Sequence, residues 1–223
     1  MKNIYMGVLV GFCAACTQPQ ANTKPDTEEV WTEPNPQTAV SIVKIDTRDV
    51  VVDERIDDRE WVTVDIELIE AENNEDARFD GPVSWTGQVG IHIRGNSTVS
   101  YEKKQYALEG RDDAGDDADL TPFGMPTEED WVLQAPYSDK TLMRNHLMYT
   151  WSRAIGRYAA RTHFVELYME DGGDVLGPED YRGVYVFMEK IKRSEHRVNV
   201  EKMEPTDTTS PNIDGGYVLK RDW

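Results

Sequence analysis

The feature that most constrains the fold is a series of short segments in which apolar and polar residues alternate. The clearest are Val62 to Leu68 and Val89 to Ile93, where every second residue is apolar. This period of two is the pattern of a strand with one buried face. Further strands are predicted around residues 40–42, 106–108, 131–133, 165–169, 184–188, 198–200 and 217–219. The chain is therefore predicted to be rich in sheet.

One segment breaks this pattern and predicts a helix. Ser138 is its expected N-cap, and Asp139 suits the positive end of a helix dipole. We expect a largely antiparallel sheet with this one long helix packed against it, which is an α+β fold. The apolar residues that recur at helical spacing, and so share one face, are Met143, Leu147, Trp151, Ala154, Ile155 and Tyr158.

The N-terminal residues predict export. Lys2 precedes a short apolar stretch, Met6 to Ala15, and about 20 apolar residues would be needed to span a bilayer. Small residues stand before Cys16, as they do before the lipidated cysteine of a lipoprotein; ordinary cleavage with Cys16 incidental is the alternative. We expect residues 1–16 to be a signal peptide with lipidation at Cys16. The protein is then an exported lipoprotein on the cell envelope, at the outer membrane if its source is Gram-negative.

Composition divides the rest of the chain. Residues 17–38 are rich in Gln, Thr, Asn, Pro and Glu and predict a flexible tether, because they bury too little apolar surface to fold. Residues 39–223 are long enough for one domain core, and both cysteines precede them, so no disulfide is expected there. The formal net charge of −18 argues against a nucleic-acid partner and limits membrane contact to the lipid anchor.

The first candidate binding residues follow the predicted strand that ends at Arg94. Asn96 and Ser97 come next in a turn with one glycine, and such a turn presents backbone N–H groups to a phosphate while Arg94 adds charge. Lys103 and Lys104 then begin a strand, where a lysine can hold phosphates. Lys104 shares a face with the apolar residues of that strand and is slightly favoured. A plain β-turn and two solvated lysines are the alternatives.

Two further candidates lie later in the chain. Lys140 and Arg144 are one helical turn apart and share a face, so both can meet an anion. Alternatively, Asp139 and Arg144 anchor the helix by pairing. Glu189 ends an apolar strand, where it fits either a hinge that meets an adenine or a charged edge that blocks strand pairing. No metal site is predicted, because the four histidines are scattered and the expected domain has no cysteine.

Taken in order, these motifs resemble the CotH family, the spore-coat kinase-like proteins. The resemblance covers roughly Val89 to Tyr217. It rests on the segments Arg94 to Thr98, Lys103 to Leu108, Asp130 to Leu133, Tyr137 to Asn145, Phe164 to Tyr168, Gly183 to Tyr185, Glu189 to Lys192 and Gly215 to Tyr217.

The resemblance implies an atypical kinase-like fold that binds ATP with a divalent metal such as Mg²⁺ and phosphorylates Ser or Thr of proteins. The implied partner is a protein substrate or surface partner. The family's catalytic and metal-binding aspartates lie beyond Trp223, so the catalytic residues are unknown and the domain is expected to be truncated. The residues then expected to bind ATP or its phosphates are Arg94, Asn96, Ser97, Lys103, Lys104, Lys140, Arg144 and Glu189.

Two alternatives to a kinase stay open. The first is a non-catalytic cell-surface structural or adhesion module on the same fold, with a partner-binding face and no nucleotide dependence. The second is a small β-rich carbohydrate-binding lipoprotein, which rests on the six tryptophans and ten tyrosines. Most of these aromatic residues fall at apolar strand or helix positions, where a place in the core is the simpler interpretation.

Overall fold

The computed structural model describes residues 37–54, 60–71, 76–173, 175–214 and 216–218. The expected signal peptide at residues 1–16, with its lipidation site at Cys16, lies outside the described residues. Of the expected tether at 17–38, only Gln37 and Thr38 are described, and they form the short strand β1.

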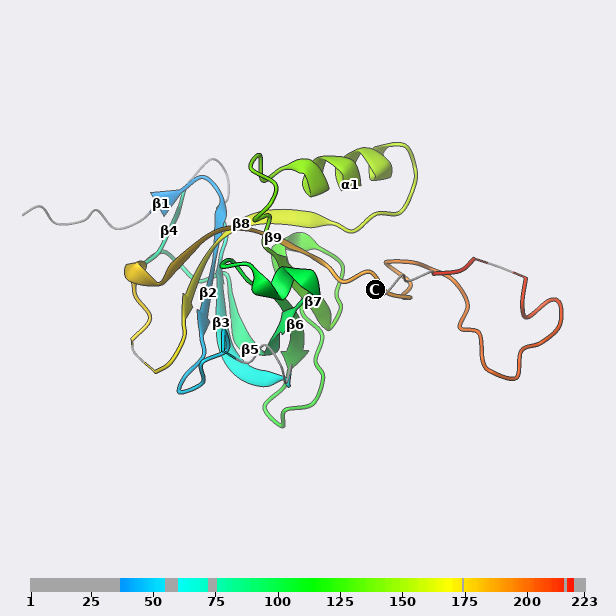
Figure 1. The fold of residues 1–223 in the computed structure, drawn as a ribbon, viewed down its shortest axis with the longest axis horizontal. Helices are drawn as coiled ribbons and strands as arrows, with labels where there is room; N and C mark the ends of the chain where they lie inside the picture. Colours follow the sequence, from blue (N-terminus) through cyan, green and yellow to red (C-terminus); the bar gives the residue numbers. More distant parts are fainter. Residues whose placement is uncertain (1–36, 55–59, 72–75, 174, 215, 219–223) are drawn as a thin grey trace, which may run out of the picture. The chain divides into compact units, whose positions relative to one another are not determined.

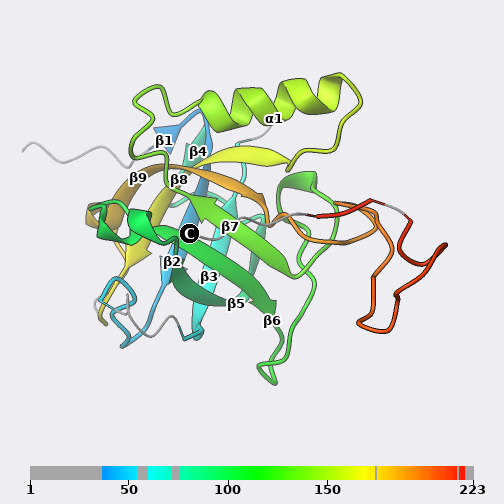
Figure 2. The same ribbon diagram turned by 45° about the vertical axis from the view of Figure 1, so that its right-hand side comes forward.

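Seven strands form a closed barrel in the order β2–β3–β5–β6–β7–β9–β8 (Figures 1 and 2). All neighbouring strands are antiparallel except β2 and β8, whose parallel pairing closes the sheet. The strands are β2 (Ser41–Asp46), β3 (Val62–Ile69), β5 (Trp85–Arg94), β6 (Gln105–Arg111), β7 (Asp130–Gln134), β8 (Thr162–Glu170) and β9 (Tyr181–Glu189).

Few other elements accompany the barrel. Strand β1 (Gln37–Thr38) pairs with β4 (Ala77–Arg78), and helix α1 (Arg144–Ala154) runs outside the barrel wall. No helix in the described ranges is long and apolar enough to cross a bilayer. The remaining elements are the 3₁₀ turns η1 (Ser97–Ser100), η2 (Pro122–Gly124) and η3 (Pro178–Asp180).

The main core fills the barrel interior. Alternate residues of each strand point inward, and Trp131 and Tyr106 are among the largest side chains that are fully buried there. A second cluster covers the outer face of β7 and β9 under helix α1, where Val132 and Val186 pack with Tyr149 of the helix. The alternation of the sequence is thus explained by a wall whose inner face is largely apolar.

The predicted α+β class and the kinase-like fold implied by the resemblance are wrong, because the fold is mostly β. A closed seven-stranded barrel stands in place of a sheet with one long packed helix, and helix α1 has only 11 residues, none of them buried. The strand periodicity was sufficient to locate β3 and β5, but it carries no information about whether the first and last strands of a sheet meet. The β2–β8 contact joins Ser41 to Val165, which are far apart in the sequence.

The predicted helix face is also wrong, because it points away from the barrel. Trp151 and Ile155 are 59% and 78% exposed, and the helix instead packs through His146, whose ring lies 4.7 Å from that of Phe164. The helix begins at Arg144 rather than after Ser138. The reason is local: the residues before Arg144 form a turn, which the next subsection describes.

Two of the predicted strands do not form. Val198 makes only an isolated bridge with Arg193, Val200 belongs to no strand, and Tyr217 lies outside any strand. Leu219, the other apolar residue of the last segment, lies outside the described residues. A closed barrel has no free edge to which a further strand could add, so a short alternating segment after β9 finds no partner in the wall.

The barrel interior predicts a sharp contrast between two identical substitutions. Val64→Ala removes two methyl groups from a fully buried site on β3 and should lower the free energy of unfolding by roughly 1.5–3 kcal/mol. Val175→Ala, at a residue that is 90% exposed, should change it by less than about 0.5 kcal/mol. Urea unfolding of both variants measures the difference; equal effects would contradict the assignment of the core to the barrel interior.

Candidate functional site

The loops of the barrel gather at two ends, which we name after a residue at each. The Arg94 end holds the β5–β6 loop, the β7–α1 connection and the β8–β9 connection, since Arg94 pairs with Gln105 and Gln134 pairs with Val186. The Glu189 end holds the ends of β6 and β9 and the start of β7. All the predicted phosphate-binding residues except Glu189 lie at the Arg94 end.

The β5–β6 loop is folded tightly at its first residues. Gly95 has φ of +113°, and a Cβ atom there would lie 2.0 Å from Oγ1 of Thr98, so only glycine fits. Lys104 fixes the other side of the loop, because its ammonium donates to the carbonyls of Val99 and Tyr101 at 2.9 and 2.7 Å. The predicted Lys104 is therefore engaged within its own loop.

Lys103 reaches out of the loop toward β9. Its ammonium donates to the Val184 carbonyl at 2.6 Å and lies 4.5 Å from the centre of the Tyr185 ring. Gly183 leaves room for it, since a Cβ atom there would come within 3.0 Å of the nitrogen. Burial lowers the pKa of Lys103 below its ordinary value. Of the two lysines, Lys103 has the ammonium that reaches beyond its own loop.

A pocket of about 320 Å³ opens beside Lys103 at the mouth of the barrel. Asp53 lies in it, accepts a hydrogen bond from the Tyr106 hydroxyl and pairs with Arg182 at 3.4 Å. Burial, followed by the charge of Asp53, raises the pKa of Tyr106 well above its ordinary value, so this phenol stays neutral. The sequence interpretation did not group Asp53, Tyr106 and Arg182, because they come from three distant segments; Tyr106 was read only as a strand residue of the segment Lys103 to Leu108.

The connection that leads into helix α1 lies against the β5–β6 loop. The Tyr137 ring is 5.0 Å from that of Tyr101, which brings the two segments together. Lys140 donates to the Tyr137 carbonyl at 2.9 Å. Asp139 accepts the backbone N–H of Arg144 at 2.9 Å and pairs with its guanidinium at 3.4 Å. The anchoring alternative is therefore present: Asp139 accepts the N–H of the helix's first residue, Arg144, and pairs with its guanidinium.

Three polar groups at the Arg94 end lack the partners that buried groups normally have. Burial lowers the pKa of Arg94, and no carboxylate pairs with its guanidinium within the described part of the chain. Oγ1 of Thr98 and Oε1 of Gln134 are buried without a hydrogen-bond partner among the described residues. Each such group is unfavourable unless something polar meets it. Arg94 was predicted from the sequence, whereas Thr98 and Gln134 carried no signal of their own.

Glu189 lies at the other end of the barrel, away from the remaining candidates. It is fully buried, pairs with the Arg161 guanidinium at 2.6 Å and accepts the Arg161 backbone N–H at 2.8 Å. Both of its oxygens are thus used to tie the end of β9 to the residue before β8. The structure does not bring Glu189 together with the Arg94 loop.

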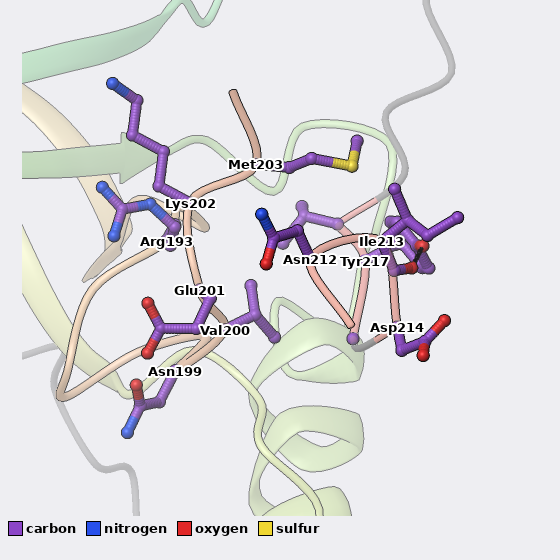
Figure 3. Close-up of a pocket in the computed structure, with 12 residues that line it drawn as sticks. Arg193, Asn199, Val200, Glu201, Lys202, Met203, Asn212, Ile213, Asp214 and Tyr217 are labelled. Atoms are coloured by element: carbon purple, nitrogen blue, oxygen red, sulfur yellow. Dashed lines mark hydrogen bonds between the residues drawn. The ribbon is translucent and has the colours of Figure 1, made fainter. Parts of the chain in front are cut away.

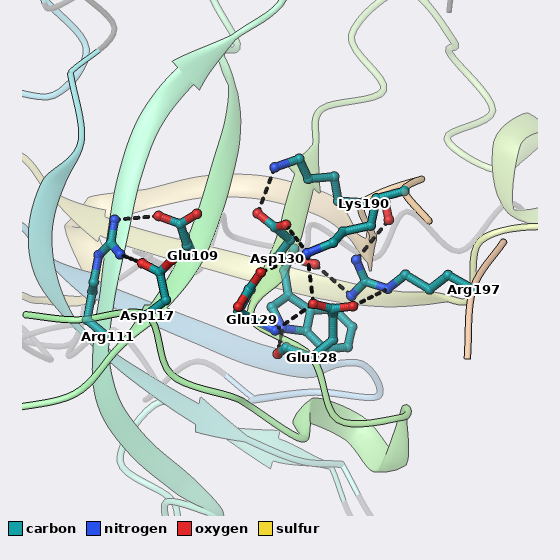
Figure 4. Close-up of polar contacts among 10 residues, drawn as sticks. Glu109, Arg111, Asp117, Glu128, Glu129, Asp130, Lys190 and Arg197 are labelled. Atoms are coloured by element: carbon teal, nitrogen blue, oxygen red, sulfur yellow. Dashed lines mark hydrogen bonds and ion pairs between the residues drawn. The ribbon is translucent and has the colours of Figure 1, made fainter. Parts of the chain in front are cut away.

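Beyond Glu189, a charge network ties the chain after β9 to β7 (Figure 4). The Lys192 ammonium donates to Glu128, Glu129 and Asp130 at 3.0, 2.8 and 2.6 Å. Lys190 also donates to Asp130, at 2.7 Å. The six residues of the network are Glu128, Glu129, Asp130, Lys190, Lys192 and Arg197.

The network accounts for a group of three carboxylates in the described ranges that lie close together. One oxygen from each of Glu128, Glu129 and Asp130 lies within 4.8 Å of the others, a spacing that could hold a metal ion. The Lys192 ammonium already binds all three, so these carboxylates do not fit a divalent ion while Lys192 is in place. Arg197 completes the tie by donating to the Asp130 carbonyl at 2.7 Å.

The network predicts a pH-dependent effect of one substitution. Burial alone would raise the pKa of Asp130, but hydrogen bonds from Lys190 and Lys192 outweigh it and hold the pKa below its ordinary value. The stabilisation is therefore present above about pH 4 and is lost as the pH falls through the folded-state pKa. Lys192→Met should lower the free energy of unfolding by roughly 1–3 kcal/mol at pH 7, and this deficit should shrink toward pH 3.

Urea unfolding across that pH range measures the deficit. Lys202→Met is the matched control, since its pair with Glu204 is largely exposed and should change stability little at any pH. A Lys192→Met deficit that stays constant with pH would contradict the network's role.

Comparison with known proteins gives one family. The model of the CotH kinase protein family matches residues 91–222, more than half of the chain. No curated protein matches the chain. The matched range begins within β5 and includes the Arg94 loop, helix α1 and Glu189, so it spans both ends of the barrel. The resemblance seen in the motifs is thereby confirmed, and the chain belongs to the CotH kinase protein family.

Proposed function

We propose that this protein binds ATP at the Arg94 end of the barrel and transfers its terminal phosphoryl group to Ser or Thr of a protein substrate. Membership of the CotH kinase protein family supports kinase-like function. The geometry of the Arg94 end supports the location. Family membership alone names neither the acceptor protein nor the residues that hold the nucleotide.

The observation that carries the location is the set of unsatisfied polar groups. Arg94 is a desolvated cation without a carboxylate partner in the described chain, and phosphate oxygens are the acceptors that a guanidinium fork fits best. The Thr98 hydroxyl can donate to a further oxygen, and Oε1 of Gln134 can accept from a ribose hydroxyl or a base amine. A nucleotide offers both kinds of group in one molecule.

Three other cations lie at the same end and support binding of a polyanion. Lys103 has two donors beyond its one hydrogen bond to Val184. Lys140 lies in the connection before helix α1, and Arg144 is the first residue of the helix. The Tyr101–Tyr137 contact holds that connection beside the loop. Arg144 is paired with Asp139, so the charges of Lys103 and Lys140 do most to lower the energy of a phosphate group there, within a protein whose overall charge of −18 would otherwise repel it.

The described residues fit the divalent metal that the family implies less well than they fit the nucleotide. When bound with ATP, such an ion neutralises charge on the transferred phosphoryl group. The clustered carboxylates Glu128, Glu129 and Asp130 bind Lys192 and lie at the Glu189 end, away from the proposed nucleotide position. We therefore assign the metal no ligand among the described residues. The residues of this chain orient the nucleotide, and the acids of phosphoryl transfer stay unassigned.

A second function is favoured by a different observation. Helix α1 presents Trp151 and Ile155 to solvent, and exposed apolar side chains on one helix are typical of a protein-binding surface. A non-catalytic cell-surface module would use such a face without any nucleotide. Either function is compatible with export and lipidation at Cys16, which we also propose and which would hold the domain on the cell envelope.

The proposal predicts that ATP with Mg²⁺ raises the melting temperature of the full-length chain. A ligand present at 100 times its Kd and bound only to the folded state adds about 2.7 kcal/mol, a shift of several degrees. Arg94→Met and Lys103→Met should each reduce the shift, because each removes a cation from the phosphate position. Differential scanning fluorimetry measures it, and transfer of label from γ-labelled ATP to a Ser/Thr-containing acceptor tests the reaction.

Arg78→Met is the matched control. Arg78 lies on β4 and forms an exposed ion pair with Asp80, so its replacement should leave the melting-temperature shift unchanged. A wild-type chain that shows no shift would argue against nucleotide binding and favour the surface module. A shift that survives both Arg94→Met and Lys103→Met would place the nucleotide elsewhere on the protein.

A further inference from the structure

The Glu189 end of the barrel interior is covered by the connection between β6 and β7. Leu120 and Met125 of this connection are buried in the interior cluster, and Phe123 of η2 packs against it. We call residues 120–125 the plug. The chain after β9 does not supply this cover: residues between Arg193 and Val218 line a separate pocket of about 450 Å³ (Figure 3), and none of those described belongs to the interior cluster.

The backbone of the plug is strained at its aromatic residue. Phe123 has φ of +52° and ψ of +35°, in the left-handed region that bulky side chains rarely adopt. Such a conformation persists only where the surrounding contacts hold it. The contacts of the Phe123 ring therefore keep the plug in place, and weakening them favours its relaxation. One contact is with Phe187 of β9, whose ring lies 5.2 Å away, edge to face.

The second aromatic contact of Phe123 is the titratable residue His163 of β8. The two rings are 4.3 Å apart and only 4° from parallel. His163 precedes the interior residue Val165 by two positions, so its side chain points into the barrel. Its Nε2 lies 2.9 Å from Oγ of Ser41 on β2, which is 1% exposed. The same oxygen accepts the Ala71 N–H at 3.2 Å.

This arrangement fits neutral His163. A Ser41 oxygen that accepts the Ala71 N–H still has a proton to donate, and Nε2 of a neutral imidazole accepts it. Protonation turns Nε2 into a donor, which removes that acceptor and puts a charge in a partly buried position. Burial, followed by the charge of His146, lowers the pKa of His163 below its ordinary value. The stabilisation is therefore present above about pH 6.5 and is lost as the pH falls below it.

Few charged groups face His163 from the elements packed around it. Helix α1 contributes His146, which forms a hydrogen bond to Oγ1 of Thr162 at 2.9 Å. Glu189 and Arg161 lie at the same end of the barrel but pair with each other at 2.6 Å. Within the described ranges no carboxylate pairs with His163, so none offsets the charge of an imidazolium there. The neutral side chains that face it from β2, η2 and β9 are Ser41, Phe123 and Phe187.

We propose that the plug is an acid-sensitive closure of the barrel: neutral His163 holds Phe123 in place, and protonation of His163 favours release of the plug. Release uncovers the interior at the Glu189 end. The same connection carries Glu128 and Glu129, which bind Lys192, so release also loosens the attachment of the chain after β9. The proposal does not depend on nucleotide binding.

Hydrogen exchange of the full-length chain at pH 7 and pH 5 tests this proposal. Each measured rate is divided into the intrinsic rate at the same pH, which gives a protection factor. The amides of Leu120 and Met125 report on the plug, since they donate to the carbonyls of Glu128 and Pro122. Their protection should fall between about three-fold and 25-fold at pH 5, the upper limit being set by the ordinary His pKa of about 6.5. The amides of β5 should keep their protection.

Two histidine variants identify the group that responds. His163→Gln keeps an oxygen that can accept from Ser41 but cannot titrate, so plug protection should be equal at the two pH values. His146→Gln is the matched control and should retain the fall. A fall that persists in His163→Gln, or one that disappears in His146→Gln, would overturn the proposal. So would wild-type protection that is unchanged at pH 5, or that rises because an imidazolium is attracted to the Phe123 ring.

A measurement on the wild type protects the test against a His163→Gln variant that does not fold. The pKa of His163 is read from its ring protons by NMR. Plug protection should begin to fall near pH 6.5 and level off close to that pKa, because further acid then adds no proton difference between the closed and released states. Levelling off more than about one pH unit from the measured pKa would contradict the role of His163.

Discussion

The parallel pairing of β2 with β8 is the contact on which the rest of the structure depends. It joins the first long strand to one that begins more than a hundred residues later, and it turns a sheet with two edges into a closed wall. Closure fixes the inner face as the core and leaves no edge for the alternating residues after β9. It also sorts the loops into two ends, which decides which candidate residues can act together.

The two ends differ in how their charges are satisfied. At the Glu189 end, buried acids meet cations within the chain: Glu189 binds Arg161, and Asp130 binds Lys190 and Lys192. Residues paired in this way have few hydrogen-bonding groups left for a ligand. Removing one member of a pair would leave the other as a buried charge without a partner. At the Arg94 end, the guanidinium of Arg94 and the hydroxyl of Thr98 are buried without such partners in the described chain. Chemistry is therefore expected at the Arg94 end, while the Glu189 end holds the chain after β9.

The candidate site was only partly readable from the sequence. Arg94 ends an apolar strand just before a glycine turn, and this local pattern singled it out; its role in binding phosphate stays a prediction. The same kind of pattern grouped Glu189 with it, yet the barrel places Glu189 at the opposite end. Asp53 and Arg182 form an ion pair at 3.4 Å, but neither local sequence segment predicts that the other lies beside it. Periodicity shows which residues of an element share a face. Only the pairing of strands shows which strand ends lie at the same end of the barrel.

The sequence by itself determined local features. These are most strands of the barrel, the turn that needs glycine at Gly95, the motifs of the family, and the existence of a helix near Arg144. These follow from side-chain period and backbone sterics, which act over a few residues. Tertiary structure alone decided the closure of the barrel and the direction of the helix. Helical spacing placed Trp151 and Ile155 on one face, but it cannot say whether that face meets the wall or solvent. That choice depends on which side of the helix fits the β8–β9 surface, where His146 and Tyr149 pack.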